Sequence, residues 1–236
     1  MKSTLRLNRC VVAGLLWCTT AAAQALTPYT AEYDLTWDVG MTLSGTASQR
    51  MSLENDTWRL QQNANASLGS LNETSIFRLN ETGRILPLEF VRKTTLLGRT
   101  KEQQTRFNWN QRQAQMGDVT VDLDDNVFDP LTLQLELRSA LNDGRSLSLK
   151  LADRGRIREY PIENLGLQTL DTPDGPLSVV HLRYTKNEQD HTDLWFDPAR
   201  EHLMIGMRAT RDGKVFELTL RSAQLSPRDA IVAKPQ

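Results

Sequence analysis

Five side chains between residues 181 and 195 form the densest group in the chain that could do chemistry: His181, Arg183, His191, Asp193 and Trp195. A histidine beside a carboxylate can exchange a proton with it, and an indole can stack on a ligand ring. The same residue types also occur on the wet face of a sheet, as a cross-strand salt bridge and an aromatic pair. We favour this second interpretation.

The spacing of these residues predicts that they meet across a β-hairpin. A three-residue loop at 187–189 sets Arg183 opposite Asp193 and His181 opposite Trp195. Apolar residues then alternate with them on the other face, which is what a correct register produces.

A second hairpin is predicted at Asp212 and Gly213, a two-residue turn signal. This turn sets Arg208 opposite Glu217 on one face of the hairpin. The other face then pairs apolar residues only: Ala209 with Phe216, Met207 with Leu218, and Ile205 with Leu220.

An acidic segment between residues 118 and 129 resembles a calcium loop only superficially. Such a loop needs Asp or Asn at positions 1, 3 and 5, Gly at 6 and Glu at 12, and the spacing here differs. A loop leading into a capped helix explains these residues better, so we predict no metal site. The residues are Asp118, Asp122, Asp124, Asp125 and Asp129.

Catalytic motifs are not found in the sequence. Both cysteines precede residue 19, no Gly-x-Ser-x-Gly elbow is present, and no glycine-rich loop could cradle a phosphate. The sequence therefore predicts no catalytic residue and no cofactor.

A helix is predicted at residues 129–141. Asp129 suits the N-cap, Pro130 the first helical position and Gly144 the C-terminal stop. Leu131, Leu135 and either Leu137 or Leu141 would then face the sheet. A strand remains the alternative, because leucines also alternate at every second position from 131 to 137.

Elsewhere short segments alternate apolar and polar residues with the period of a half-buried strand. Such spacing predicts a mainly β fold with a meandering antiparallel sheet. The candidate strands are 29–37, 43–53, 57–67, 71–80, 88–97, 101–110, 146–152, 155–163, 176–185, 191–197, 203–210 and 215–222.

The N-terminus has the order of a secretory signal. Lys2, Arg6 and Arg9 precede an apolar run at 11–18 and small residues that end at Ala25. The run is far shorter than the roughly 20 residues that a membrane-spanning helix needs. We expect cleavage after Ala25, no lipid anchor and localisation in the periplasm.

Removal of residues 1–25 would leave a cysteine-free chain with 25 basic and 29 acidic residues, a formal charge of −4. Its charges are interspersed, which makes nucleic acid an improbable partner. We expect one β-rich domain at 26–225, which is long enough to fold without disulfides, and a flexible tail at 226–236. No transmembrane segment is predicted after signal removal, and the sequence does not indicate an oligomeric state.

Four short segments, in this order and spacing, resemble a family of bacterial exported proteins known as "domain of unknown function 3108". They are YTAEY at 29–33, FDPLT at 128–132, TPDG at 172–175 and LWFD at 194–197. The resemblance implies export to the periplasm, a β-rich fold and no established activity. We expect a strongly curved antiparallel sheet or open half-barrel, with the one central helix against its concave side.

Two functions remain open from the sequence. The first is a non-enzymatic binding or cell-envelope maintenance protein, whose apolar concave face accepts a lipid or a segment of an envelope protein. The second is an envelope hydrolase that uses carboxylates or the His and Asp residues. The candidate binding residues are His181, Arg183, Asp193, Trp195 and, on the helix, Leu135.

Overall fold

The computed structural model describes residues 26–38, 40–172 and 175–226. In these ranges the chain forms sixteen β-strands, one α-helix and the short 3-10 helix η1 (Pro198–Arg200). The mainly β fold is confirmed. The predicted signal segment 1–25 and residues 227–236 of the predicted tail lie outside the described residues.

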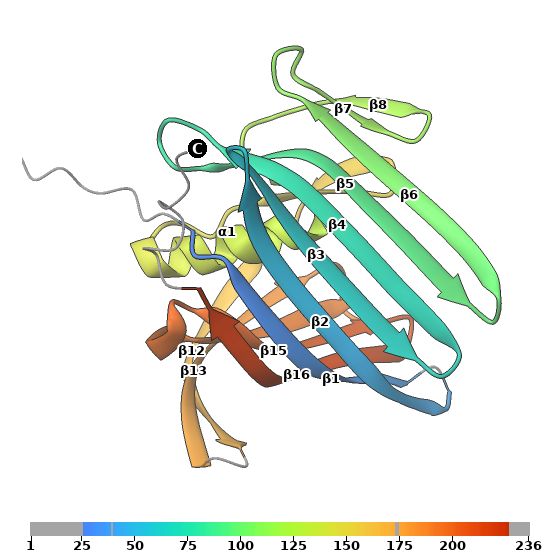
Figure 1. The fold of residues 1–236 in the computed structure, drawn as a ribbon, viewed down its shortest axis with the longest axis vertical. Helices are drawn as coiled ribbons and strands as arrows, with labels where there is room; N and C mark the ends of the chain where they lie inside the picture. The colour runs from blue at the N-terminus through green and yellow to red at the C-terminus, as the bar shows by residue number, and fades with distance from the viewer. Residues whose placement is uncertain (1–25, 39, 173–174, 227–236) are drawn as a thin grey trace, which may run out of the picture.

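Thirteen strands form one antiparallel sheet that curves strongly without closing, because its edge strands β12 and β8 do not pair with each other. The predicted curved sheet is therefore confirmed (Figure 1). From edge to edge the strands are β12 (Ile162–Thr172), β13 (Gly175–Thr185), β14 (His191–Asp197), β15 (Leu203–Arg211), β16 (Lys214–Leu225), β1 (Tyr29–Asp38), β2 (Thr42–Glu54), β3 (Thr57–Ala66), β4 (Gly69–Leu79), β5 (Ile85–Leu96), β6 (Arg99–Asn108), β7 (Gln113–Met116) and β8 (Val119–Asp122).

A small second sheet consists of β9 (Val127–Phe128), β10 (Lys150–Asp153) and β11 (Arg156–Glu159). β9 and β10 run parallel, whereas β10 and β11 form an antiparallel hairpin. Since β9 directly precedes the helix and β10 follows it, the helix is the crossover between two parallel strands.

β-Bulges help to bend the large sheet. A bulge inserts an extra residue on one strand, which bends that strand and increases its local twist. The pairing register shifts between Glu32 and Tyr33, Ile76 and Phe77, Asn164 and Gly166, and Trp195 and Phe196.

Both predicted hairpin registers are confirmed, except that the β15–β16 pairing ends at Gly206 and Thr219 and does not include the predicted pair of Ile205 with Leu220. His181 pairs with Trp195 and Arg183 with Asp193 between β13 and β14. Between β15 and β16, Arg208 pairs with Glu217, Ala209 with Phe216 and Met207 with Leu218.

Some strands differ from the prediction. The predicted strand 155–163 is not one strand: it contains β11 and the start of β12, which Tyr160 and Pro161 separate because proline cannot donate to a ladder. The prediction missed β12 because this edge strand is exposed on both faces and shows no alternation. It also missed β7, β8 and β9, which are only two to four residues long.

The helix α1 (Pro130–Asp143) confirms the predicted helix over the alternative strand. Asp129 Oδ1 accepts hydrogen bonds from the backbone N–H of Leu131 (2.9 Å) and Thr132 (3.0 Å). The Thr132 hydroxyl accepts from the N–H of Asp129, which completes a capping box. Gly144 ends the helix with a φ of 63°, a conformation that favours glycine.

α1 is enclosed on more than one side, which explains its apolar residues at alternating positions. It packs against β4, β5 and β15 of the large sheet and against β9 and β10 of the small one. Figure 1 shows α1 in the opening of the curve. Four leucines of the helix are buried as a result: Leu131, Leu133, Leu135 and Leu137.

We expect Asp129→Ala to lower the free energy of unfolding by about 2 kcal/mol or more, because it removes the helix cap and a partner of a buried hydroxyl. That hydroxyl belongs to Ser75, which donates to Asp129 Oδ2 over 2.7 Å. Asp129→Asn is the matched control, since its amide oxygen still accepts from the helix N-terminus. Urea denaturation measures both variants, and an alanine variant as stable as the wild type would contradict the role of this cap.

Candidate functional site

A row of polar side chains crosses the concave face of the large sheet. It consists of Gln49, Gln62, Glu73 and Arg92, on β2, β3, β4 and β5, and each residue pairs with the next across neighbouring strands. Gln49 Nε2 donates to Gln62 Oε1 (2.6 Å), and Gln62 Nε2 donates to Glu73 Oε2 (3.2 Å). Arg92 Nε donates to Glu73 Oε1 (2.5 Å). We call these four residues the polar row.

Further contacts connect the polar row to the surrounding elements. Gln49 Nε2 also donates to Gln134 Oε1 of α1 (3.2 Å), and the Tyr29 hydroxyl donates to Gln49 Oε1 (3.0 Å). At the other end, Arg92 donates to Asp153 of β10 over 3.0 Å. The row therefore connects the large sheet, the helix and the small sheet.

The Arg92 guanidinium remains charged although the side chain is mostly buried. Burial by itself lowers its pKa, but the carboxylates of Glu73 and Asp153 outweigh this effect and raise the pKa above its ordinary value. Buried charges are tolerated only when they are paired in this way. The polar row is thus a set of mutually satisfied groups.

A cavity of about 380 Å³ lies beside the polar row on the same concave face. Such a volume is within the range of about 300–1,000 Å³ that ligand pockets have. Gln62, Glu73 and Arg92 border the cavity together with Gln134 and Pro130 of the helix. The remaining walls are mixed. The apolar residues are Leu35, Trp37, Ala64, Ala66, Gly69, Leu71, Met207, Ala209 and Phe216, and the polar ones are Ser70, Thr94, Arg154, Tyr184, Thr192, Arg211, Asp212 and Lys214. We call this space the concave cavity.

Small residues on β3 and β4 leave this space open. Ala64, Ala66 and Gly69 lie on the inner face, with Ala66 and Gly69 paired across the strands. Gly69 is required by its backbone surroundings, because an added Cβ would lie 2.6 Å from the carbonyl oxygen of Thr95. On the other side of the polar row the inner face carries large side chains such as Phe77 and Phe90, which fill the core.

Four of the candidate residues from the sequence do come together. His181 Nε2 lies 2.7 Å from Asp193 Oδ1, and Arg183 Nε donates to the same oxygen over 2.7 Å. The His181 and Trp195 rings stack with centroids 4.9 Å apart. His191 Nε2 lies 3.5 Å from Asp193 Oδ2.

The prediction of a solvated face is wrong for the centre of this cluster, because the His181 and Asp193 side chains are buried. Burial by itself raises the pKa of Asp193, but the hydrogen bonds from Arg183 and His181 lower it below its ordinary value of 3.8. The centre of the cluster is therefore the buried carboxylate of Asp193, which binds both Arg183 and His181.

None of these four residues lines the concave cavity, nor does Leu135. Leu135 is buried in the hydrophobic core, whereas Pro130 and Gln134 are the helix residues at the cavity. The sequence analysis did not select the polar row. The only available signal was the presence of glutamine, glutamate and arginine at inward positions of alternating strands.

The described residues contain no group of three or more His, Cys, Asp or Glu side chains that could hold a metal ion. Two aspartates of the acidic segment pair with basic side chains in the structure. Asp124 pairs with Lys150 (2.5 Å) and Asp125 with Arg112 (2.7 Å).

In the described part of the chain, no helix has both the length and the apolar character that crossing a membrane requires.

Comparison with known proteins identifies relatives of unknown function. The family described as "Protein of unknown function (DUF3108)" matches residues 32–220. No curated protein sequence matches the chain significantly.

Two solved structures match the chain in a structural comparison, and the first of them has a similar fold. A β-barrel-like protein of the domain of unknown function DUF1849 from Brucella abortus has 14% sequence identity and a TM-score of 0.57, over 86% of this chain and 99% of that chain. A DUF1329 family protein from Desulfovibrio piger has 10% identity and a TM-score of 0.31, over 90% and 89% of the two chains. At 14% identity the first match shows the fold alone.

We expect Asp193→Asn to lower the free energy of unfolding at pH 7 by about 1–3 kcal/mol, because it removes the charge from a buried acceptor. A pKa below its ordinary value means that the carboxylate stabilises the fold above pH 3.8 and loses this effect as the pH falls through the lowered pKa. The difference between wild type and variant should therefore shrink on acidification below pH 3.8.

Asp34→Asn is the control for this prediction, because Asp34 and its partner Arg221 are both exposed. Ion pairs on the surface contribute about 1 kcal/mol at most to the free energy of unfolding. Urea denaturation across the acidic range measures both variants, and equal losses would contradict a special role of the buried pair.

Proposed function

The chain belongs to the DUF3108 family of proteins of unknown function, and we propose that it is a non-enzymatic binding protein whose concave cavity holds the apolar chain of an amphiphile. The observation that carries this proposal is a cavity of about 380 Å³ with apolar side chains from β1, β3, β4, β15 and β16 and a polar row along one side. We also propose that the protein acts in the cell envelope after export to the periplasm, which its N-terminal sequence supports.

Apolar contact supplies the driving force for this binding. Burial of each CH₂ group contributes about 0.8 kcal/mol. The cavity offers Leu35, Leu71, Met207 and Phe216 as contact surfaces from four different strands. An unbranched acyl or alkyl chain fits such walls because it needs no hydrogen-bond partner.

A peptide segment is a poorer occupant for the same cavity. Each residue of a peptide carries a backbone donor and acceptor that need partners when buried. The strands that line the cavity from the large sheet are paired on both sides, so they offer no free backbone edge. Moreover, the polar row already satisfies its own groups internally.

We expect the affinity for straight-chain alkyl amphiphiles with one common head group to rise about fourfold for each added CH₂ until the cavity is full. Isothermal titration calorimetry with chains of 8, 10, 12 and 14 carbons measures this series. Dissociation constants that do not depend on chain length would contradict burial of the chain.

We expect Ala66→Phe to abolish amphiphile binding, because the larger side chain fills the concave cavity from the partly exposed wall of β3. Asn65→Phe is the matched control, since the neighbouring residue lies exposed on the opposite face of the same strand. It should bind as the wild type does. Circular dichroism and thermal denaturation establish that both variants fold.

If Ala66→Phe does not fold, Ala209→Leu on β15 is the alternative variant, because Ala209 lines the same cavity from another strand. Unchanged binding in a folded cavity variant would overturn the proposal. A concentration-dependent dimer that amphiphile does not dissociate would overturn it in favour of a second copy as the occupant, and sedimentation velocity detects this outcome.

A further inference from the structure

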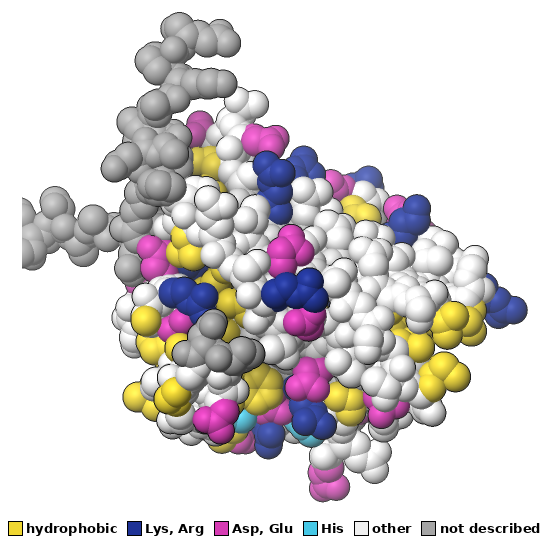
Figure 2. All heavy atoms as spheres, turned by 60° about the horizontal axis from the view of Figure 1, so that its bottom comes forward, with side chains coloured by type: hydrophobic (Ala, Val, Ile, Leu, Met, Phe, Trp, Pro, Cys, Tyr) yellow, Lys and Arg dark blue, Asp and Glu magenta, His cyan; other side chains and the backbone are white. Residues whose placement is uncertain are grey.

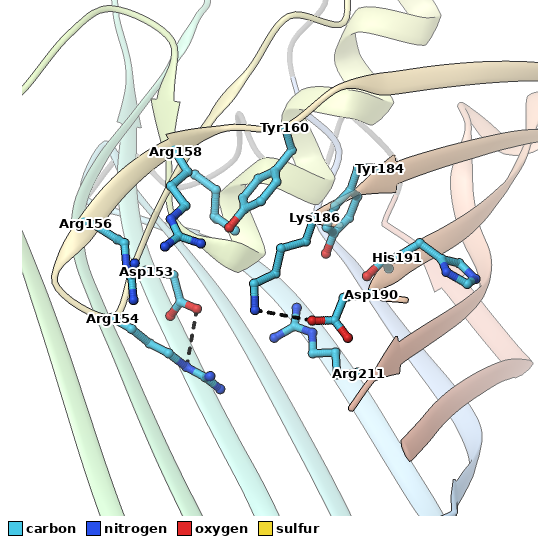
Figure 3. A pocket seen from close by; sticks show the side chains of 12 residues that line it. Asp153, Arg154, Arg156, Arg158, Tyr160, Tyr184, Lys186, Asp190, His191 and Arg211 are labelled. Carbon is cyan, nitrogen blue, oxygen red and sulfur yellow. Dashed lines mark hydrogen bonds and ion pairs between the residues drawn. The ribbon is translucent and has the colours of Figure 1, made fainter. Parts of the chain in front are cut away.

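A pocket rich in arginine lies directly beside the concave cavity. Its basic side chains are Arg154, Arg156, Arg158, Lys186 and Arg211, and we call it the basic pocket. They come from the β10–β11 hairpin, from the end of β13 and from β15. Figure 3 shows them around one opening, with the tyrosines Tyr160 and Tyr184 at its side.

Positive charge is in excess in the basic pocket. Five cationic side chains face only two carboxylates, those of Asp153 and Asp190. Asp153 already binds Arg92 of the polar row over 3.0 Å and lies 3.6 Å from Arg154. The second carboxylate is likewise engaged.

Asp190 accepts from the backbone N–H of Asp212 (2.9 Å) and from Asn187 Nδ2 (3.1 Å), while Lys186 Nζ lies 3.5 Å away. Both carboxylates of the pocket therefore already have partners: Asp153 pairs with Arg92 and Arg154, and Asp190 with Lys186, Asn187 and the backbone of Asp212. The remaining cations are therefore available to an anionic ligand.

Among the residues that the structure describes, Arg156, Arg158 and Arg211 form no ion pair (Figure 3). The face of the molecule in Figure 2 differs from this arrangement. Figure 2 shows basic and acidic side chains interspersed over the visible face, with hydrophobic side chains in small separate groups. Three unpaired guanidinium groups around one small pocket are thus a local feature.

The basic pocket and the concave cavity adjoin each other. Arg154, Tyr184, Thr192 and Arg211 line both of them. The basic pocket has a volume of about 90 Å³, whereas the cavity has about 380 Å³. The smaller, polar space suits a compact charged group, and the larger space suits a chain.

We infer that the basic pocket binds the phosphate or carboxylate head group of an amphiphile whose chain occupies the concave cavity. This inference rests on the proposed function and deepens it, because it restricts the ligand to anionic amphiphiles. Guanidinium groups match the planar and bidentate geometry of phosphate and carboxylate oxygens. The tyrosine hydroxyls add neutral donors beside them.

The test compares two amphiphiles with the same chain, dodecyl phosphate and neutral dodecyl maltoside, by isothermal titration calorimetry below their micelle concentrations. The wild type should bind dodecyl phosphate at least about tenfold more tightly, since charged hydrogen bonds each contribute more than neutral ones. Arg156→Gln and Arg158→Gln, which line the basic pocket but not the concave cavity, should together remove most of this preference. Binding of dodecyl maltoside should change less than threefold.

Arg208→Gln is the matched control, because Arg208 is an exposed residue of β15 and its side chain points away from the cavity. This variant should keep the preference of the wild type. Inorganic phosphate alone is the last arm, and it should compete weakly with dodecyl phosphate and not at all with dodecyl maltoside.

Three different outcomes would each contradict a different claim. Equal affinity of the wild type for both amphiphiles would overturn the head-group site and leave the proposed function intact. Inorganic phosphate that binds as tightly as dodecyl phosphate would show a free-phosphate site independent of any chain. No binding of either amphiphile to the folded protein would overturn the proposed function itself.

Discussion

The concave face of one thirteen-stranded sheet has to be kept from water, and the rest of the structure follows from that requirement. A single helix, α1, is too short to cover the whole face. It covers the part that carries large side chains such as Phe77 and Phe90, and it is fixed there by Asp129, which caps its N-terminus and accepts from Ser75 of β4. The uncovered part carries small residues on β3 and β4, so it is a cavity instead of a core.

The polar row marks the border between these two parts. A glutamate and an arginine on an inward face are costly unless they are paired, and the cross-strand order of Gln49, Gln62, Glu73 and Arg92 pairs each one with its neighbour. The row also holds Gln134 of α1 and Asp153 of β10. It therefore fixes the elements around the cavity as well as lining it.

The cavity and the basic pocket together have the polarity of an amphiphile. Apolar walls lie at one end, and guanidinium groups without ion-pair partners among the described residues lie at the other. The buried cluster around Asp193 has a different character. Its charges neutralise one another, and its side chains line neither space, apart from the edge residue His191 at the basic pocket. Its geometry is that of a structural ion pair.

The sequence by itself determined the features that depend on nearby residues. Asp129, Pro130 and Gly144 define the ends of α1 through local backbone chemistry, and the turn at Asp212 and Gly213 sets the register of β15 and β16. Alternation along each strand also showed which side chains share a face, because the period of a strand is two residues.

Only the tertiary structure decided what those faces contact. Alternation assigns Leu60 and Ala66 to the same inner face, but the position of α1 across that face determines that Leu60 lies in the covered core and that Ala66 borders an open cavity. Similarly, Arg158 and Arg211 are 53 positions apart in the chain, and they meet because the β10–β11 hairpin reaches the end of β15. Contacts of this kind depend on the curvature of the whole sheet, which no local segment encodes.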